Sequence, residues 1–131
     1  MVTTPQLAAA PTKDDPVEPV VIFDHVSIGF EGKQVLNDIS LTVSPGETRI
    51  LLGPAGSGKS VLLKLANGLM RPDSGTITVF GEPIDTMPEE QLFKLRGRIG
   101  MVFQEGALFD SLTVRDNVAY RMMEQKVPEA E

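Results

Sequence analysis

The sequence lacks cysteine, an excess of positive charge and any long apolar run, and each absence excludes a class of protein. Without cysteine there is no disulfide framework, no thiolate nucleophile and no cysteine-bound metal cluster, which is consistent with a reducing compartment such as the cytoplasm. Eighteen acidic residues against 12 basic ones argue against a nucleic-acid partner, because that surface needs clustered positive charge. No run approaches the roughly 20 apolar residues that span a bilayer, so a membrane role would depend on a partner.

The chain begins with a polar, proline-rich segment and continues with a globular pattern. The residues that mark the first segment are Pro5, Pro11, Pro16, Pro19, Asp14, Asp15 and Glu18. Its short apolar patch at 7–10 lacks the basic start and the long apolar centre of a signal peptide. We predict a flexible tail over 1–19, followed by one small globular unit, or part of one, over 20–131.

The first predicted elements form an antiparallel pair of strands. Residues 20–30 and 35–43 are rich in β-branched and aromatic side chains, and Glu-Gly-Lys-Gln between them is typical of a turn. Residues 48–53 are a short apolar run ending in glycine, which favours a buried strand of a parallel sheet. A strand and turn are expected over 74–84, and another short apolar strand over 99–104.

Three helices are expected between and after these strands. The first should begin near Gly58 and end by Gly68 or Pro72, and its predicted buried side consists of Val61, Leu62, Leu65 and Leu69. The boundary residues of the second are Thr86, Pro88, Glu89 and Gly97, and those of the third are Thr113, Asp116 and Pro128. Thr86 and Glu89 would form a capping box, whereas Asp116 would lie in an acidic first turn.

The stretch Gly-Pro-Ala-Gly-Ser-Gly-Lys-Ser at 53–60 matches the phosphate-binding pattern G-x-x-x-x-G-K-[ST], with the fixed positions Gly53, Gly58, Lys59 and Ser60. Its glycines let backbone N–H groups point at a phosphate, and the following helix adds its positive N-terminal end. Lys59 would reach phosphate oxygens, and the Ser60 hydroxyl would bind a Mg²⁺ ion on the same phosphates. The alternative is a glycine-rich turn with an exposed lysine, although a chance match is on the order of 10⁻⁵ per site.

Phe30, just before the first predicted turn, has two interpretations on its residue type alone. An aromatic ring there could stack on a nucleobase, an interaction worth about 1–3 kcal/mol in nucleic-acid systems. The alternative is a core side chain.

Phe30, the loop at 53–60, the segment 68–84 and a strand pattern ending in Gln104 occur in this order, and together they resemble the ATP-binding subunit of ABC transporters from Val20 to Lys126. The resemblance implies an α/β fold, a P-loop NTPase with a RecA-like core and an antiparallel β subdomain. It also implies ATP and Mg²⁺ as cofactors. The implied nucleotide-binding residues are Phe30, Gly53, Pro54, Ala55, Gly56, Ser57, Gly58, Lys59, Ser60 and Val61. The implied metal ligands are Ser60 and Gln104, and the implied catalytic residues are Gln104, which also positions the attacking water, and Lys59.

Two details resemble the ATPases of MCE-type lipid transporters, the MlaF-like group. They are Val61, where many ABC subunits have a second hydroxyl residue, and the segment 105–120. This resemblance implies ATP hydrolysis that drives phospholipid transport linked to outer-membrane lipid asymmetry, with an MlaE-like transmembrane permease and an MCE-domain lipid-binding protein as partners. It implies a cytoplasmic protein held on the inner face of the membrane through the permease. Leu108 and Phe109 are candidates for an apolar permease contact, with buried core as the alternative.

Four parts of the family pattern do not occur in these 131 residues: the signature motif, the Walker B strand ending in Asp and Glu, the D-loop and the switch histidine. His25 precedes the P-loop, which favours a structural or surface role, and Glu105 has no support as a base. We expect the N-terminal portion of a longer ATPase, truncated before the signature and Walker B elements. Family members work as ATP-dependent homodimers.

This portion alone is expected not to hydrolyse ATP. In the family the general base is the glutamate of the Walker B strand, and a positioned general base contributes about 10²–10⁴ in rate. Other interpretations stay open. An ABC ATPase for amino-acid, metal or lipoprotein cargo is one, and a regulatory module that holds ATP without turnover is another. A P-loop kinase outside this family is disfavoured, because the basic stretch 94–98 is more typical of a solvated helix end.

Overall fold

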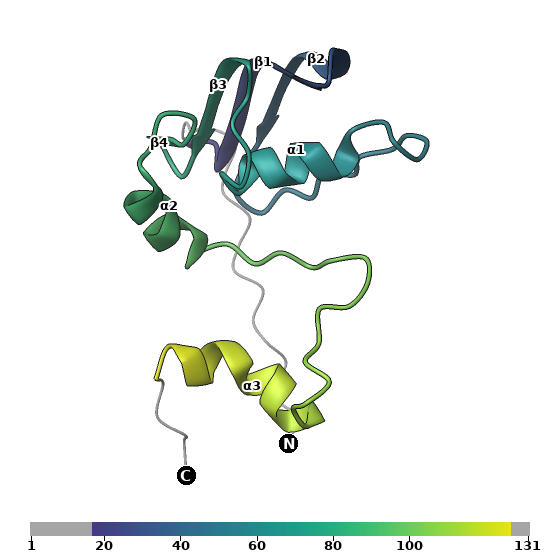
Figure 1. The fold of residues 1–131 in the computed structure, drawn as a ribbon. Coiled ribbons are helices and arrows are strands. Elements are labelled where there is room, and N and C mark those ends of the chain that lie inside the picture. Colours follow the sequence, from purple (N-terminus) through teal and green to yellow (C-terminus); the bar gives the residue numbers. More distant parts are fainter. Residues whose placement is uncertain (1–16, 127–131) are drawn as a thin grey trace. The chain divides into compact units, whose positions relative to one another are not determined.

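The computed structural model describes residues 17–126 and divides the chain into two compact units, one ending at Ile99 and the other starting at Gly100. The first unit contains β1 (Val21–Phe30), β2 (Lys33–Val43), α1 (Lys59–Ala66), β3 (Ser74–Val79), β4 (Glu82–Pro83) and α2 (Glu89–Arg96). The second contains α3 (Val114–Glu124). Figure 1 labels the elements of the first unit, in which α1 lies along one face of the sheet.

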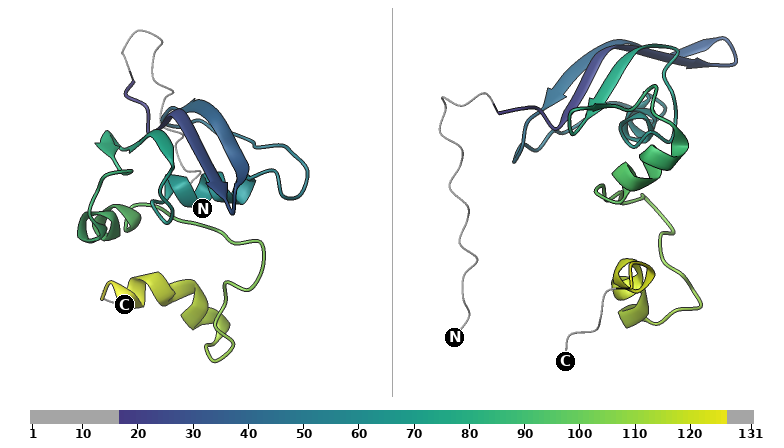
Figure 2. Two further views of the ribbon diagram at one scale, coloured as in Figure 1. Left: turned by 45° about the horizontal axis from the view of Figure 1, so that its top comes forward. Right: turned by 90° about the vertical axis from the view of Figure 1, so that its left-hand side faces the viewer.

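The sheet is antiparallel and its strands lie in the order β2-β1-β3-β4. The hairpin predicted from residues 20–43 is confirmed: Phe30 pairs with Lys33 and Ile28 with Leu36. The strand and turn expected over 74–84 are β3 and β4. Figure 2 shows the sheet from two further directions, with α1 on the same face in each.

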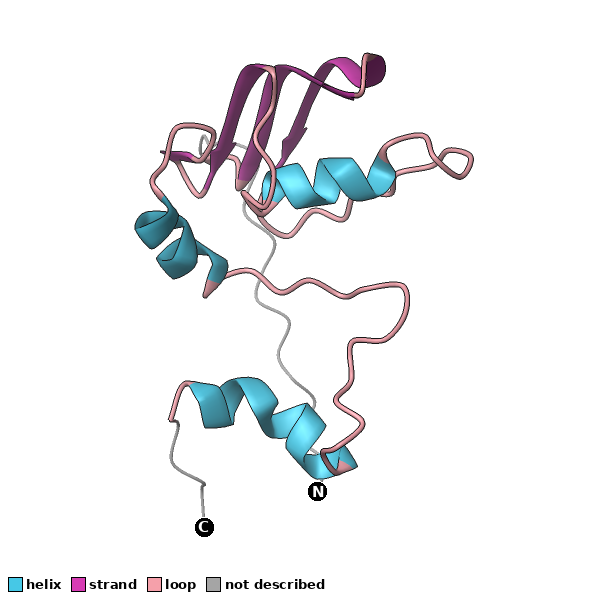
Figure 3. Cartoon of the chain, viewed as in Figure 1, coloured by secondary structure: helices cyan, strands magenta, loops and turns pink. Residues whose placement is uncertain are grey.

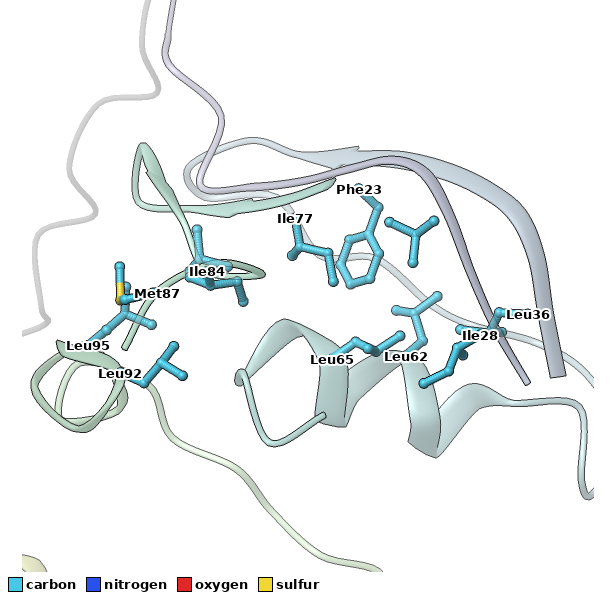
Figure 4. Close-up of a cluster of buried hydrophobic side chains, with 12 residues drawn as sticks. Phe23, Ile28, Leu36, Leu62, Leu65, Ile77, Ile84, Met87, Leu92 and Leu95 are labelled. Carbon is cyan, nitrogen blue, oxygen red and sulfur yellow. The ribbon is translucent and has the colours of Figure 1, made fainter. Parts of the chain in front are cut away.

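The core of the first unit fills the space between this face and the two helices. Figure 4 shows Leu62 and Leu65 of α1 pointing toward Phe23 and Ile77 of the sheet. The buried apolar side chains are Phe23, Val26, Ile28, Leu36, Leu62, Leu65, Ile77, Val79, Ile84, Met87, Leu92 and Leu95. Two of these side chains, Leu92 and Leu95, belong to α2. Helices as short as α1 and α2 are not stable alone in water, so both depend on this apolar burial.

The first helix begins at Lys59, next to the predicted start, but its buried side is narrower than expected. Leu62 and Leu65 are buried and Val61 is half-buried, whereas Leu69 is 51% exposed, so its predicted burial is wrong. The reason is local: α1 ends at Ala66, and Gly68 with φ 63° turns the chain, which removes Leu69 from the helical face.

The second helix begins later than expected. Its N-cap is Pro88, which makes no side-chain capping bond, so the capping box of Thr86 and Glu89 is wrong. Proline has no N–H and fixes its own φ, which suits it to a helix start. Glu89 instead pairs with Arg96, about two turns further along the same side of the helix, and Gly97 is the C-cap as expected.

Two segments expected to be strands are open loops: 48–53, expected as a buried parallel strand, and 99–104, expected as a short apolar strand (Figure 3). In 48–53, Ile50 is 77% exposed and Leu52 is 90% exposed, and in 99–104 Val102 is 94% exposed. A parallel strand depends on hydrogen bonds to neighbouring strands. Within residues 17–126 there is no parallel pair of strands, so neither run has a neighbouring parallel strand to bond with.

His25 lies on the surface of β1, at a bulge that faces Asp38 across the hairpin. Its ring Nδ1 is 2.6 Å from a carboxylate oxygen of Asp38, and this hydrogen bond raises the pKa of His25. Both residues have positive φ, 51° and 53°. The structural or surface role expected for His25 is confirmed.

The third helix begins as expected. The Thr113 hydroxyl oxygen accepts a hydrogen bond from the backbone N–H of Asp116 and donates one to its carboxylate. Pro128, expected to end this helix, lies outside the described residues. No residue of α3 is buried, so the helix presents apolar side chains on its surface.

Leu108 and Phe109 precede α3 in the second unit. Leu108 is 74% exposed and Phe109 is 48% exposed, which excludes the buried-core interpretation. The ring of Phe109 packs on that of Tyr120, with 4.6 Å between centroids. Across residues 17–126, no helix combines the length and apolarity that a membrane crossing requires.

Replacing Leu65, which has no exposed surface, with alanine is expected to lower the free energy of unfolding by about 2–5 kcal/mol, because it leaves a cavity between α1 and the sheet. Leu69→Ala is the matched control and should change stability by only about 0.5 kcal/mol, since half of that side chain is already in water. Urea unfolding of the 131-residue chain measures both. Equal losses would mean that Leu69 belongs to the core after all.

Candidate functional site

The phosphate-binding pattern forms a tight loop that runs directly into α1. Within it, the N–H of Ser57 donates to the carbonyl of Pro54 at 3.2 Å. Gly56 and Gly58 have φ of 78° and 92°, a left-handed conformation that glycine adopts without a steric penalty. The loop geometry therefore needs two of the glycines that the sequence pattern contains.

Gly58 is needed for a second reason, which the sequence did not suggest. A methyl group at this position would lie 2.7 Å from Leu36 and 3.1 Å from Val35, both on β2. The end of the loop is therefore packed against the sheet without room for a side chain. Gly53 is crowded in the same way, because its methyl group would lie 2.6 Å from the Ser57 hydroxyl oxygen.

Lys59 closes the loop on itself. Its ammonium group donates to the carbonyls of Gly53 and Pro54, each at 2.7 Å, and to the hydroxyl of Ser57 at 3.1 Å. Gly53 and Pro54 begin the loop and Ser57 lies in its middle, so the Lys59 side chain, near the end of the loop, fixes its curvature. The positive charge of Lys59 is thus held within the residues that the sequence assigns to phosphate.

The N-terminus of α1 has no internal partner for its positive end. Its N-cap, Gly58, offers no side-chain acceptor, and its first turn contains no acidic residue. The first N–H groups of a helix lack intrahelical partners and carry a partial positive charge. Since Ser60 in this turn is exposed, its hydroxyl is accessible to an ion bound next to the loop.

Phe30 lies at the end of β1 and is 40% exposed, which fits a stacking surface better than a core position. Its strand partner, Lys33, comes two residues before Val35, one of the residues against which Gly58 packs. The hairpin therefore brings Phe30 to the end of β2 that supports the loop. An aromatic face and a phosphate-binding loop lie within the same unit.

Gln104 lies in the second unit, in an exposed bend. The role of Gln104 beside the phosphate loop stays a prediction. The predicted domain bounds, 20–131, also stay a prediction. Within residues 17–126, no three His, Asp or Glu side chains are grouped to hold a metal ion. A Mg²⁺ ion would therefore have to take most of its ligands from phosphate and water, with Ser60 and Gln104 as the protein's share.

A hollow of about 270 Å³ lies beside the loop. It is lined by Leu36, Ile39, Ile50, Leu51, Leu52, Ser57, Gly58, Lys59 and Leu62. Most of this lining is apolar, and part of it comes from the run 50–52 that was expected to be a buried strand. The polar part is the loop itself, so phosphate chemistry is confined to one side of the hollow.

The family comparison places residues 36–131 within the ABC transporter family. The chain is 40% identical to the methionine import ATP-binding protein MetN of Bifidobacterium longum over 79% of its own length and 27% of that protein. It is 37% identical to the probable ribonucleotide transport ATP-binding protein mkl of Mycobacterium bovis, over 88% of its length and 32% of that protein. The chain thus spans between a quarter and a third of these relatives.

Solved structures resemble the fold. The likeness to cbiO1 from Clostridium perfringens, part of the ABC transporter complex cbiONQ, has a TM-score of 0.75 at 32% identity and covers 84% of this chain and 44% of the other. A dimeric ATP-binding cassette in a post-hydrolysis state, bound to ADP and Pi, gives 0.72 at 26% identity, covering 85% and 50%.

Proposed function

Since this chain belongs to the ABC transporter family and has the P-loop NTPase fold of its ATPases, we propose that it forms the ATP-binding part of an ABC transporter ATPase. The single observation that carries the proposal is the loop at 53–60, curled around Lys59 and joined to a helix whose N-terminus has no internal acceptor. Such a helix start favours an anion with several oxygens, and a triphosphate has that chemistry.

Each nucleotide group would have its own protein partner. Backbone N–H groups of 56–60 and the Lys59 ammonium would bind phosphate oxygens. For this, Lys59 would give up its bonds to the carbonyls of Gly53 and Pro54, and the N–H of Ser57 would give up its bond to the Pro54 carbonyl. Ser60 and Gln104 would hold Mg²⁺, which supplies charge neutralisation between phosphates. Phe30 would support the adenine ring. Pro54, Ala55 and Val61 would shape the loop around them.

Lys59→Ala is expected to remove most of the stabilisation that Mg-ATP gives to the folded chain, because it deletes the charge that the loop encloses. At a hundredfold excess over Kd, the wild type should gain about 2.7 kcal/mol, read as a shift of the melting temperature. Phe30→Ala should weaken the shift, since the phosphate contacts stay while the adenine support is lost. Glu105→Ala is the control and should shift like the wild type. An undiminished shift in Lys59→Ala would overturn the assignment of the loop.

We also propose that the 131-residue chain holds ATP without turning it over, since its sequence contains no apolar strand that ends in Asp and Glu to supply a base. The expected result is no release of phosphate from Mg-ATP above the level given by Lys59→Ala. Magnesium-dependent phosphate release that Lys59→Ala abolishes would contradict this, and would mean that another group activates water.

For the transported cargo we propose phospholipid. The support is Val61 after the loop and the segment 105–120, which resemble MCE-type ATPases. Relatives carry names for methionine, ribonucleotide and spermidine/putrescine transport, so family membership leaves the cargo open. The same proposal includes an MlaE-like permease, an MCE-domain partner, an ATP-dependent homodimer and a position on the cytoplasmic face of the membrane.

Purification of the tagged chain from native membranes in mild detergent should bring down a permease together with an MCE-domain protein. Leu108 and Phe109, both exposed, are our candidates for the permease contact, and a Leu108→Ser, Phe109→Ser variant should lose the permease. Recovery of a permease with a binding protein for amino acids or polyamines would replace the lipid assignment. The variant Phe93→Ser, which changes an exposed apolar residue of the first unit, is the control.

A further inference from the structure

The end of α1 opposite the phosphate loop is held by a single arginine from α2. Arg96 donates from Nε to the carbonyl of Asn67 at 3.0 Å and from Nη2 to the carbonyl of Gly68 at 2.7 Å. These carbonyls follow the last turn of α1, where the helix carries its partial negative charge. The guanidinium therefore binds α1 as a fork, with two hydrogen bonds from one planar group.

The remaining nitrogen of the Arg96 guanidinium, Nη1, faces Glu89. The Nη1 group donates to the carboxylate of Glu89, and this hydrogen bond lowers the pKa of Glu89. The side chain of Arg96 is 24% exposed, whereas that of Glu89 is 73% exposed. Most of the arginine is thus enclosed between the two helices, and the carboxylate closes it from the solvent side.

Close packing at the same place leaves the helix end little freedom. A methyl group on Gly68 would lie 2.7 Å from Cδ2 of Leu92, a buried residue of α2. The positive φ of Gly68 turns the chain here, so its carbonyl reaches Arg96 while Leu92 fills the space that a Cβ would need. One short segment is fixed both by hydrogen bonds and by an apolar contact.

We propose that Arg96 is a positioning residue for the phosphate cradle, acting through α1. The proposal rests on the function given above, because it concerns the binding of the same triphosphate. Since α1 has 8 residues and begins at Lys59, it is a rigid rod with the cradle at one end and Arg96 at the other. Fixing the far end sets the direction in which the first N–H groups of the helix point.

A second argument comes from the order of the chain. Arg96 is the last residue of α2, and the segment that follows it leads into the second unit, which contains Gln104. The same side chain therefore ties the root of that segment to the end of the helix that carries Lys59. The binding loop and the segment toward Gln104 share one anchor in the first unit.

The test compares Mg-ATP affinity among variants of the 131-residue chain, by isothermal titration at a temperature where each is folded by circular dichroism. Arg96→Met keeps the apolar stem but removes both carbonyl bonds, and we expect its Kd to rise about threefold to tenfold. Arg96→Lys keeps the charge without the fork and should fall between Arg96→Met and the wild type. In ¹⁵N spectra of the nucleotide-free chain, the amides of Lys59 and Ser60 should shift in Arg96→Met.

Two controls separate positioning from stability. Arg71 also donates to two carbonyls, of Asp85 and Met87, but does not hold α1, so Arg71→Met should lower the melting temperature and leave Kd unchanged. Glu89→Gln removes the ion pair and keeps the carbonyl bonds, so it should also bind as the wild type does.

Wild-type affinity in both Arg96 variants, with unmoved Lys59 and Ser60 amides, would overturn the positioning role while the proposed function stands. If Arg96→Met does not fold, wild-type affinity in Arg96→Lys overturns the role by itself. A wild-type chain that fails to bind Mg-ATP would overturn the proposed function, and the positioning role with it.

Discussion

The packing of α1 on the sheet is the constraint on which the rest of the first unit depends. Leu62 and Leu65 are buried beneath the strands, and this burial fixes the helix whose first residue is Lys59. Because Gly58 lies against β2 without room for a methyl group, the loop can end in only one place relative to the hairpin. Apolar burial therefore determines where the charged and polar groups of the loop meet.

The antiparallel hairpin, α1 and the loop could be predicted from the sequence because their signals are local. Alternating β-branched residues, a turn and a glycine-lysine pattern lie within short stretches of chain. The fold class and the family are confirmed on the same basis, since the resemblance rested on the order of these stretches. The roles of Phe30, Gln104 and the loop residues stay predictions, although Phe30 and the loop lie in one unit.

Two failures depend on strand pairing, and two others depend on local backbone geometry. The apolar runs at 48–53 and 99–104 have the composition of buried strands, yet a strand exists only where another strand accepts its hydrogen bonds. Leu69 was misplaced because α1 ends at Ala66, and the capping box was wrong because Pro88 is the N-cap, while Glu89 pairs with Arg96. That arginine bonds carbonyls 28 and 29 positions away, a relation that no local pattern reveals.

The contact between Phe109 and Tyr120 has a practical meaning for spectroscopy. Tyr120 is the only tyrosine of a chain without tryptophan, and it lies in the second unit. Tyrosine fluorescence of the chain thus originates in the second unit alone, whereas the unit with the phosphate loop contributes only the weak emission of phenylalanine rings. A nucleotide that binds the first unit will change tyrosine emission only if the second unit responds, so the native chain already carries a one-site optical reporter of communication between its halves.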